Sequence, residues 1–93
     1  MTTYKKPIEV TPVSMDFSLV LPTGQTIQES SVAKIYDDTG TEVTGDMLDD
    51  TSVASPKMIA VVKGGERLRS YKITYIAFTE LYCFEEDVTI KIT

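Results

Sequence analysis

Apolar and polar residues alternate one by one along much of this chain, whereas helical periodicity is hard to find. The clearest run covers residues 70–78, in which Tyr71, Ile73, Tyr75 and Ala77 all fall on one side of an extended backbone. Strict alternation of this kind is typical of a β-strand with one face in the core and the other toward solvent. The pattern therefore predicts a protein built mainly of strands.

Further strands are expected wherever β-branched, aromatic or alternating apolar residues stand between turn signals. Pro22-Thr23-Gly24 and Asp37-Asp38-Thr39-Gly40 are such signals, because proline presets φ and Asx side chains bond the backbone just ahead of them. The polar stretch 45–56 is expected to be a connection between two sheets, which could include one helical turn at Asp46–Asp49. The remaining expected strands are 15–21, 32–36, a short one at Glu42 and Val43, 57–63 and 82–92. The inward residues are expected to be Met15, Phe17, Leu19 and Leu21 in the first of these strands, and Val88, Ile90 and Ile92 in the last. Residues 7–13 are expected to form an edge strand, where Pro7 and Pro12 are tolerated.

This succession of short strands predicts an all-β fold, an immunoglobulin-like antiparallel β-sandwich of about seven strands, formed by residues 1–93 as a single domain. A small closed barrel is the alternative. The chain has one cysteine, so the sandwich would have no disulfide, and it has no tryptophan. Tyr71 follows the Gly64-Gly65 corner and stands where the tyrosine corner of such sandwiches is expected. The residues expected in the core include Phe17, Leu19, Val61, Tyr71, Ile73 and Ile90.

The charge balance narrows the possible functions. Nine Lys and Arg residues stand against 14 Asp and Glu residues, which gives a net charge of −5. An acidic chain disfavours nucleic acid and anionic membranes as partners, because both attract clustered Lys and Arg. The longest apolar run, Met58–Val62, is far short of the roughly 20 residues of a membrane-spanning helix. The polar residues Thr2–Lys6 are also unlike a signal peptide, so none is expected.

The chain lacks the residues of common catalytic centres. It has no histidine, which excludes Ser-His-Asp triads, Cys-His pairs and histidine-ligated metal sites. Two carboxylates could in principle hydrolyse a glycosidic bond, but a 93-residue sandwich has little room for the required cleft. Cys83 stands next to an acidic run, which disfavours its thiolate. We therefore expect no enzyme activity, no catalytic residues and no cofactor.

Acidic residues gather at Asp37-Asp38, at Asp46 with Asp49-Asp50, and at Glu85-Glu86-Asp87. Carboxylates that converge from loops can bind Ca²⁺. The D-x-[DN]-x-[DN]-G pattern is missing, however, and adjacent residues on a strand point to opposite faces. The clusters therefore predict solvated turns and a strand edge guarded by charge, with no metal site. Gly64-Gly65 likewise predicts a corner with positive φ, because no phosphate-loop frame surrounds it.

Several segments together resemble a known family. Residues 61–74 contain an apolar strand, a Gly-Gly corner and a Y-x-I-T strand, and a short hinge at 79–82 and an alternating last strand at 88–92 follow. Upstream, Met15-Asp16-Phe17 and Leu21–Ile27 resemble a D-[YF]-x-x-x-L-x-x-G-[DEQ]-x-I pattern. In this order and spacing, the segments are similar to small immunoglobulin-like proteins encoded among the virion genes of tailed phages and prophages. The resemblance spans roughly residues 15–93.

This resemblance implies a non-enzymatic structural or accessory protein of a phage virion or prophage that acts as a protein–protein interaction module. Its partners would be virion proteins of the capsid, neck or tail, and a homo-oligomer is also possible. It would lie in the host cytoplasm during assembly and then in the virion. The alternative is a carbohydrate- or host-surface-binding immunoglobulin-like module. The expected loops 22–26, 37–41 and 46–55 disfavour that alternative, because they contain no aromatic residue.

One candidate interface follows from the alternation itself. If Tyr75 and Ala77 face the core, then Ile76 and Phe78 must face outward, and Cys83 faces the same way from the following strand. A contiguous apolar patch on a small domain usually marks an interface. Glu85 and Asp87 would form its charged rim. The alternative is that a loop, or the N-terminal segment 2–7 with Tyr4, covers the patch within one chain.

Overall fold

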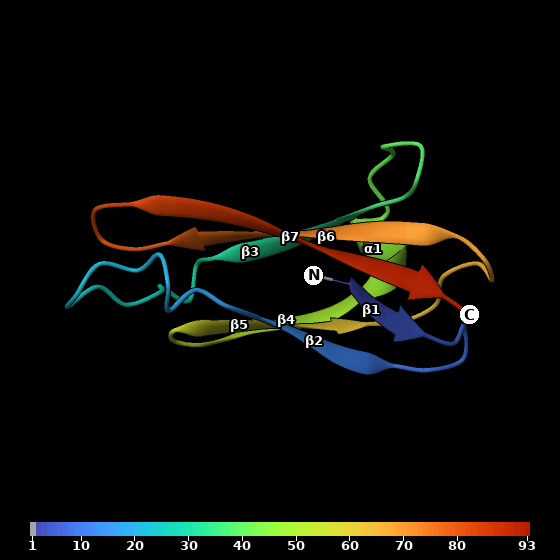
Figure 1. Ribbon diagram of the computed structural model, residues 1–93, viewed down its shortest axis with the longest axis horizontal. Coiled ribbons are helices and arrows are strands. Elements are labelled where there is room, and N and C mark those ends of the chain that lie inside the picture. The colour runs from blue at the N-terminus through green and yellow to red at the C-terminus, as the bar shows by residue number, and fades with distance from the viewer. Residues whose placement is uncertain (1) are drawn as a thin grey trace.

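The computed structural model describes residues 2–93, which form two β-sheets packed face to face (Figure 1). Seven strands and one helical turn make up the regular structure of these residues. They are, in chain order, β1 (Thr2–Lys5), β2 (Thr11–Asp16), β3 (Val32–Tyr36), α1 (Thr44–Met47), β4 (Leu48–Ala54), β5 (Lys57–Val62), β6 (Ser70–Phe78) and β7 (Cys83–Ile92).

The larger sheet has the strand order β1-β7-β6-β3, and the smaller one has the order β2-β5-β4. The predicted all-β, two-sheet architecture is therefore confirmed. Neighbouring strands are antiparallel except for β1, which runs parallel to β7 with Thr2 opposite Thr89. The prediction of a wholly antiparallel sandwich is wrong at this strand. The Lys5 ammonium helps to hold β1 in place, because it donates a 2.6 Å hydrogen bond to the Gly64 carbonyl between β5 and β6.

The core lies between the sheets, and both inward faces contribute to it. Tyr71, Ile73 and Tyr75 of β6 are buried, as the alternation predicts. The Tyr75 hydroxyl crosses the core and donates a hydrogen bond to the Val13 carbonyl on the opposite sheet. Among the other predicted core residues, Phe17 and Ile90 are also buried. The remaining buried apolar residues are Val13, Ile27, Ala33, Ile35, Met47, Met58, Ala60, Val62, Ala77, Val88 and Ile92.

Leu19 is not in the core, and the strand expected over residues 15–21 is wrong beyond its first two residues. Leu19 is 98% exposed. β2 ends at Asp16, whose Oδ1 accepts a 2.8 Å hydrogen bond from the Ser18 amide and turns the chain. The Leu21 amide then donates to the Phe17 carbonyl at 2.9 Å, so the segment coils locally. Coiling breaks the alternation on which the prediction depended.

The stretch 45–56 is not a plain connection, because it contains most of α1 and the whole of β4. The helical turn spans Thr44–Met47, two residues earlier than expected. β4 is rich in aspartate, serine and threonine, which concealed it in the sequence. It is an edge strand of the smaller sheet, so its outer face and its free edge both meet solvent and tolerate polar residues.

The edge strand expected at 7–13 begins only at Thr11. Ile8 and Val10 lie exposed in the loop before it. β2 is an edge strand, as expected, and it contains Pro12. The expectation was therefore right about the edge position and wrong about the extent.

Val61 is half-buried and is not part of the core, because the residues of β5 that face inward are Met58, Ala60 and Val62. The short strand expected at Glu42 and Val43 is reduced to a single β-bridge between Tyr36 and Glu42. Both corrections leave the sandwich architecture unchanged.

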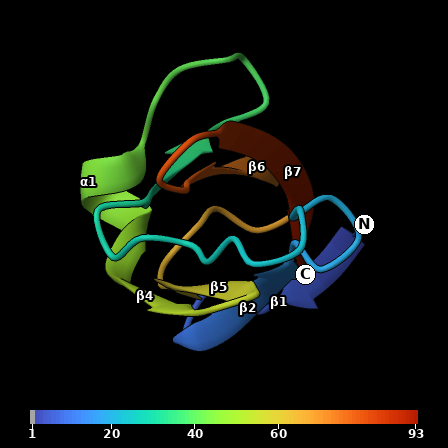
Figure 2. The same cartoon turned by 90° about the vertical axis from the view of Figure 1, so that its left-hand side faces the viewer.

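The elongated sandwich, 41 × 22 × 21 Å along its principal axes, has two different ends (Figures 1 and 2). The left end in Figure 1 carries the loop 17–31, the β4–β5 turn and the β6–β7 turn at 79–82, and we call it the loop end. The opposite end carries the connections 6–10, 37–43 and 63–69. Within residues 2–93, none of the helical structure is long and apolar enough to cross a bilayer.

Candidate functional site

The loop end is held together by hydrogen bonds between its connections. The Gln28 amide donates to the Phe78 carbonyl at 2.7 Å, and the Phe78 amide donates to the Ser31 hydroxyl at 2.9 Å. A third bond, 3.1 Å long, runs from the Ile27 amide to the Ser55 hydroxyl in the β4–β5 turn. The 17–31 loop is therefore fastened to both neighbouring turns and forms one surface with them (Figure 2).

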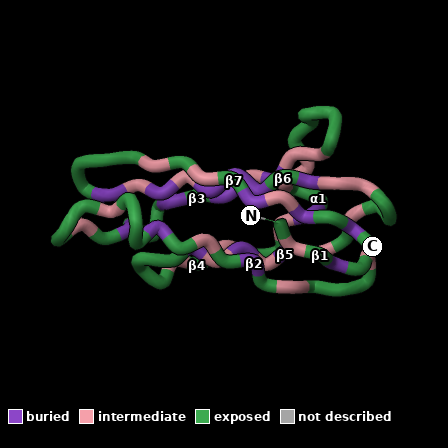
Figure 3. Tube along the Cα trace, in the orientation of Figure 1, coloured by how far each residue is buried: buried purple, intermediate pink, exposed green. Residues whose placement is uncertain are grey.

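Large apolar side chains remain exposed on this surface. Leu19 is 98% exposed in the 17–31 loop, and Leu81 is 71% exposed in the β6–β7 turn. Val20 and Tyr82 are exposed beside them in the chain. Figure 3 shows that this end of the trace is mostly exposed. The sequence pattern wrongly predicts a core position for Leu19 and assigns no role to Leu81, although an apolar residue in a tight turn is itself a signal of exposure.

The three residues predicted as an interface lie at the base of the same turn. Phe78 pairs directly with Cys83, and Ile76 pairs with Glu85, so all four side chains share the outer face of the larger sheet. Phe78 and Ile76 are half-buried, and Cys83 is exposed with a free thiol. The structure therefore places the predicted residues on one face, beside the exposed apolar residues of the turn.

The N-terminal segment does not cover this patch. β1 pairs with the other half of β7, from Thr89 to Ile92, while Cys83 begins the strand. The six residue steps from Cys83 to Thr89 span about 20 Å of extended chain. Tyr4 is exposed and lies opposite Lys91. The alternative in which residues 2–7 shield Phe78 is therefore wrong for this segment.

A polar pocket of about 360 Å³ separates the 17–31 loop from the β6–β7 turn. Gln25 is one of its lining residues, and the Oε1 atom of this side chain is buried with no hydrogen-bond partner among the described residues. The pocket is lined by Gly24, Gln25, Thr26, Gln28 and Glu80.

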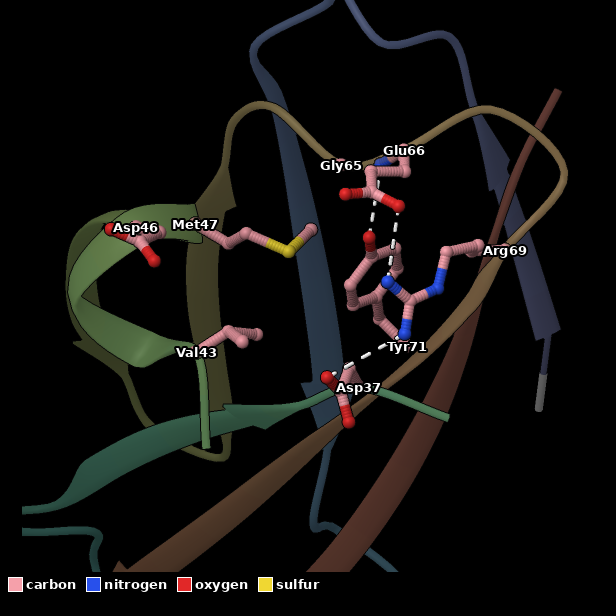
Figure 4. Close-up of a pocket in the computed structure, with 8 residues that line it drawn as sticks. All are labelled: Asp37, Val43, Asp46, Met47, Gly65, Glu66, Arg69 and Tyr71. Atoms are coloured by element: carbon pink, nitrogen blue, oxygen red, sulfur yellow. Dashed lines mark hydrogen bonds and ion pairs between the residues drawn. The ribbon is translucent and has the colours of Figure 1, made fainter. Parts of the chain in front are cut away.

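The opposite end has a pocket of about 390 Å³, and among the described residues that line it Arg69 is the only cation (Figure 4). Its guanidinium lies 2.6 Å from Asp38, 3.0 Å from Glu66 and 3.6 Å from Asp37. It also lies 5.8 Å from the centre of the Tyr71 ring. The hydrogen bonds that Arg69 donates, chiefly to Asp38 and then to Glu66, raise the pKa of Arg69, and the bonds to Asp38 lower the pKa of that carboxyl group. Because its partners already engage the guanidinium, this pocket is better described as a structural corner than as an anion site.

Asp37 closes the turn between β3 and α1. Its Oδ1 accepts hydrogen bonds from the Thr39 hydroxyl at 2.7 Å and from the amides of Thr39 and Thr41 at 2.9 Å. The bond from the Thr39 hydroxyl is the main reason why the pKa of Asp37 lies below its usual value. Within residues 2–93 there is no group of three or more Cys, Asp or Glu side chains placed to share a metal ion. The acidic pair at 37–38 thus has a structural role in this turn.

Comparisons with models of protein families, with curated protein sequences and with solved structures found no match for this chain. We therefore infer its function from its own geometry and motifs.

Proposed function

We propose that the sandwich is of the immunoglobulin-like type. With β1 set aside, strands β2 to β7 form sheets in the orders β2-β5-β4 and β7-β6-β3. Lettered B to G, these are the B-E-D and C-F-G groups of immunoglobulin domains. The Tyr71 hydroxyl accepts a 2.9 Å hydrogen bond from the Glu66 amide just upstream, which is the contact expected of a tyrosine corner. The loop end then corresponds to the end that carries the B–C and F–G loops, which immunoglobulin domains use for recognition.

We propose that the chain is a non-enzymatic interaction module, a structural or accessory protein of a phage virion or prophage. The observation that carries the interaction part is the exposure of Leu19 and Leu81 on two different connections at one fastened end of the sandwich. Exposed apolar side chains held on a rigid surface favour contact with another protein. The virion part is supported by the motif resemblance over residues 15–93, and the strand order agrees with the fold that this resemblance implies.

A carbohydrate- or host-surface-binding module is the second candidate. Tyr82 is 49% exposed in the β6–β7 turn, with its ring centre 6.1 Å from that of Phe84. The polar pocket with Gln25, Gln28 and Glu80 lies beside this turn. An exposed aromatic ring next to amide and carboxylate groups is a combination suited to sugar rings, because the ring stacks and the polar groups bind hydroxyls.

The test uses particles purified from the strain whose genome encodes this chain. Quantitative mass spectrometry should find the chain in a fixed ratio to the capsid or tail proteins across a density gradient. Its absence from particles that are otherwise complete would contradict the virion assignment. A glycan array probed with the purified protein separates the second candidate: binding that is lost in Tyr82→Ala would favour the sugar-binding module.

A further inference from the structure

One edge of β7 remains open beside the loop end. β6 pairs with the whole length of β7 on one side, but β1 pairs only with Thr89–Ile92 on the other side. The described part of the chain therefore leaves residues 83–87 without a strand neighbour on that second side. An open edge presents unpaired N–H and C=O groups and is a template for another strand.

The hydrogen-bonding pattern between β6 and β7 shows which backbone groups of β7 are available. In an antiparallel pair, alternate residues bond to the partner strand, and the residues between them point their N–H and C=O groups to the opposite edge. The Ile92 amide donates to the Arg69 carbonyl at 3.0 Å, and the Thr79 amide donates to the Tyr82 carbonyl at 2.8 Å. The even-numbered residues of β7 therefore bond to β6. The backbone N–H and C=O groups of Cys83, Glu85 and Asp87 point away from β6 and toward the open edge.

The same segment carries three consecutive carboxylates, Glu85, Glu86 and Asp87. Glu85 and Asp87 are exposed on the outer face, where an incoming strand would place every second side chain beside them. On the inner face, Phe84 is half-buried and packs against the core. A second copy of this chain fits poorly here, because edge-to-edge pairing would bring like charges together. Opposite charge on the partner would turn the same residues into an attraction.

We propose that the open edge of β7, residues 83–87, binds an extended, lysine- or arginine-rich segment of a partner protein as an additional β-strand. Main-chain hydrogen bonds to Cys83, Glu85 and Asp87 would supply register, and the acidic side chains would select a basic partner. Apolar residues at the alternate positions of the partner would extend the core beside Phe84. This inference rests on the proposed interaction function and names the chemistry of the partner.

A synthetic peptide tests the pairing directly. The probe is a blocked nine-residue peptide in which lysine alternates with valine, titrated into ¹⁵N-labelled protein. We expect the amides of Cys83, Glu85 and Asp87 to exchange with solvent more slowly in the complex. Two N-methylated versions, each lacking alternate N–H groups, form a matched pair because a strand offers alternate donors to each edge. The version that keeps the N–H groups facing β7 should bind as the parent does. The version that lacks them should bind more than about tenfold more weakly.

Protein variants test the charge. Glu85→Lys should weaken binding of the lysine peptide about fivefold, since an attractive cross-strand pair becomes repulsive. Glu42→Lys, which makes the same charge change at the opposite end, should bind as wild type does. The proposal is overturned if the peptide does not bind, or if both N-methylated peptides bind as well as the parent. It is also overturned if residues 83–87 become protected with rising protein concentration alone, because the occupant would then be a second copy. A negative peptide result with the chain still present in particles would leave the proposed function standing.

Discussion

The hydroxyl oxygen of Tyr71 accepts a hydrogen bond from the backbone amide of Glu66 at 2.9 Å. This bond ties the first turn of the 63–69 connection to the start of β6 and lies at the wall of the pocket that holds Arg69 (Figure 4). Tyr71 is buried and belongs to the hydrophobic core, although the Arg69 guanidinium lies 5.8 Å from the centre of its ring. Its ring therefore packs in the core while its polar end fixes the corner.

Removal of that hydroxyl gives the first prediction. Tyr71→Phe should lower the free energy of unfolding by about 1 kcal/mol, because one hydrogen bond is lost while the ring remains packed. Chemical denaturation followed by tyrosine fluorescence or by circular dichroism measures this change. Tyr82→Phe, which alters an exposed tyrosine, is the control and should change stability by less than about 0.5 kcal/mol. Equal stability of wild type and Tyr71→Phe would mean that the hydroxyl has no structural role.

The sequence predicted β6 and β7 well, because both strands have one face in the core and one toward solvent. Burial then matches alternation, as the buried Tyr71, Ile73 and Ile90 show. The sequence pattern did not predict β4, because a strand at the edge of a sheet does not need a polar–apolar alternation. The prediction for Leu19 was also wrong. The Ser18 amide donates a hydrogen bond to the Asp16 carboxylate, and this local bond ends the strand despite the alternation.

The site was predictable only in part. Alternation was enough to place Ile76, Phe78 and Cys83 on one outer face, because pairing across a hairpin follows from the position of its turn. The parallel pairing of β1 with β7 depends on contacts between the two ends of the chain, such as the 2.8 Å hydrogen bond that the Thr93 amide donates to the Lys5 carbonyl. No local pattern encodes such contacts, so neither the open edge of β7 nor the loop end could be found from the sequence.

Ile73 tests the inward face of β6. It is completely buried, so Ile73→Ala should lower the free energy of unfolding by about 2–5 kcal/mol through lost burial and the cavity left behind. Ile8→Ala changes the same side chain at a position that is 91% exposed and should shift stability by less than about 0.5 kcal/mol. Similar losses for the two variants would show that the assignment of faces is wrong.

Leu68 has a φ of +68°, a left-handed conformation that is unfavourable for a residue with a Cβ. Its side chain is exposed, so its removal costs little packing. Leu68→Gly should therefore raise the free energy of unfolding by up to about 1 kcal/mol, which a shift in the denaturation midpoint would show. Leu68→Ala keeps the Cβ and serves as the control, with no stabilisation expected. A clear loss of stability in the glycine variant would contradict the strain argument.

The aspartates of the 37–41 turn predict a dependence of stability on acid. Hydrogen bonds hold the pKa values of Asp37 and Asp38 below their ordinary value of 3.8 in the folded protein. As the pH falls, the unfolded chain therefore takes up protons before the folded protein does. The stability that these hydrogen bonds contribute above pH 3.8 is lost as the pH falls through the lowered pKa values. The melting temperature should therefore decline as the pH falls below about 4.

NMR titration resolves the two carboxyl groups. Thr39→Val removes the hydroxyl donor and should raise the pKa of Asp37 toward its ordinary value, while Asp38 changes little. Arg69→Gln should raise the pKa of Asp38 instead, because the bond from Arg69 is the main cause of its shift. An unchanged pKa of Asp37 in Thr39→Val would refute the assigned cause.

We expect the loop end to contact a partner protein. A photo-crosslinking amino acid placed at Leu81, and in a separate variant at Ile8, compares two exposed apolar positions at opposite ends of the sandwich. After irradiation of purified particles, mass spectrometry identifies the crosslinked peptides. We predict that the Leu81 position crosslinks to one particular virion protein and that the Ile8 position does not. Crosslinks from the Ile8 position alone, with none from the Leu81 position, would contradict the account.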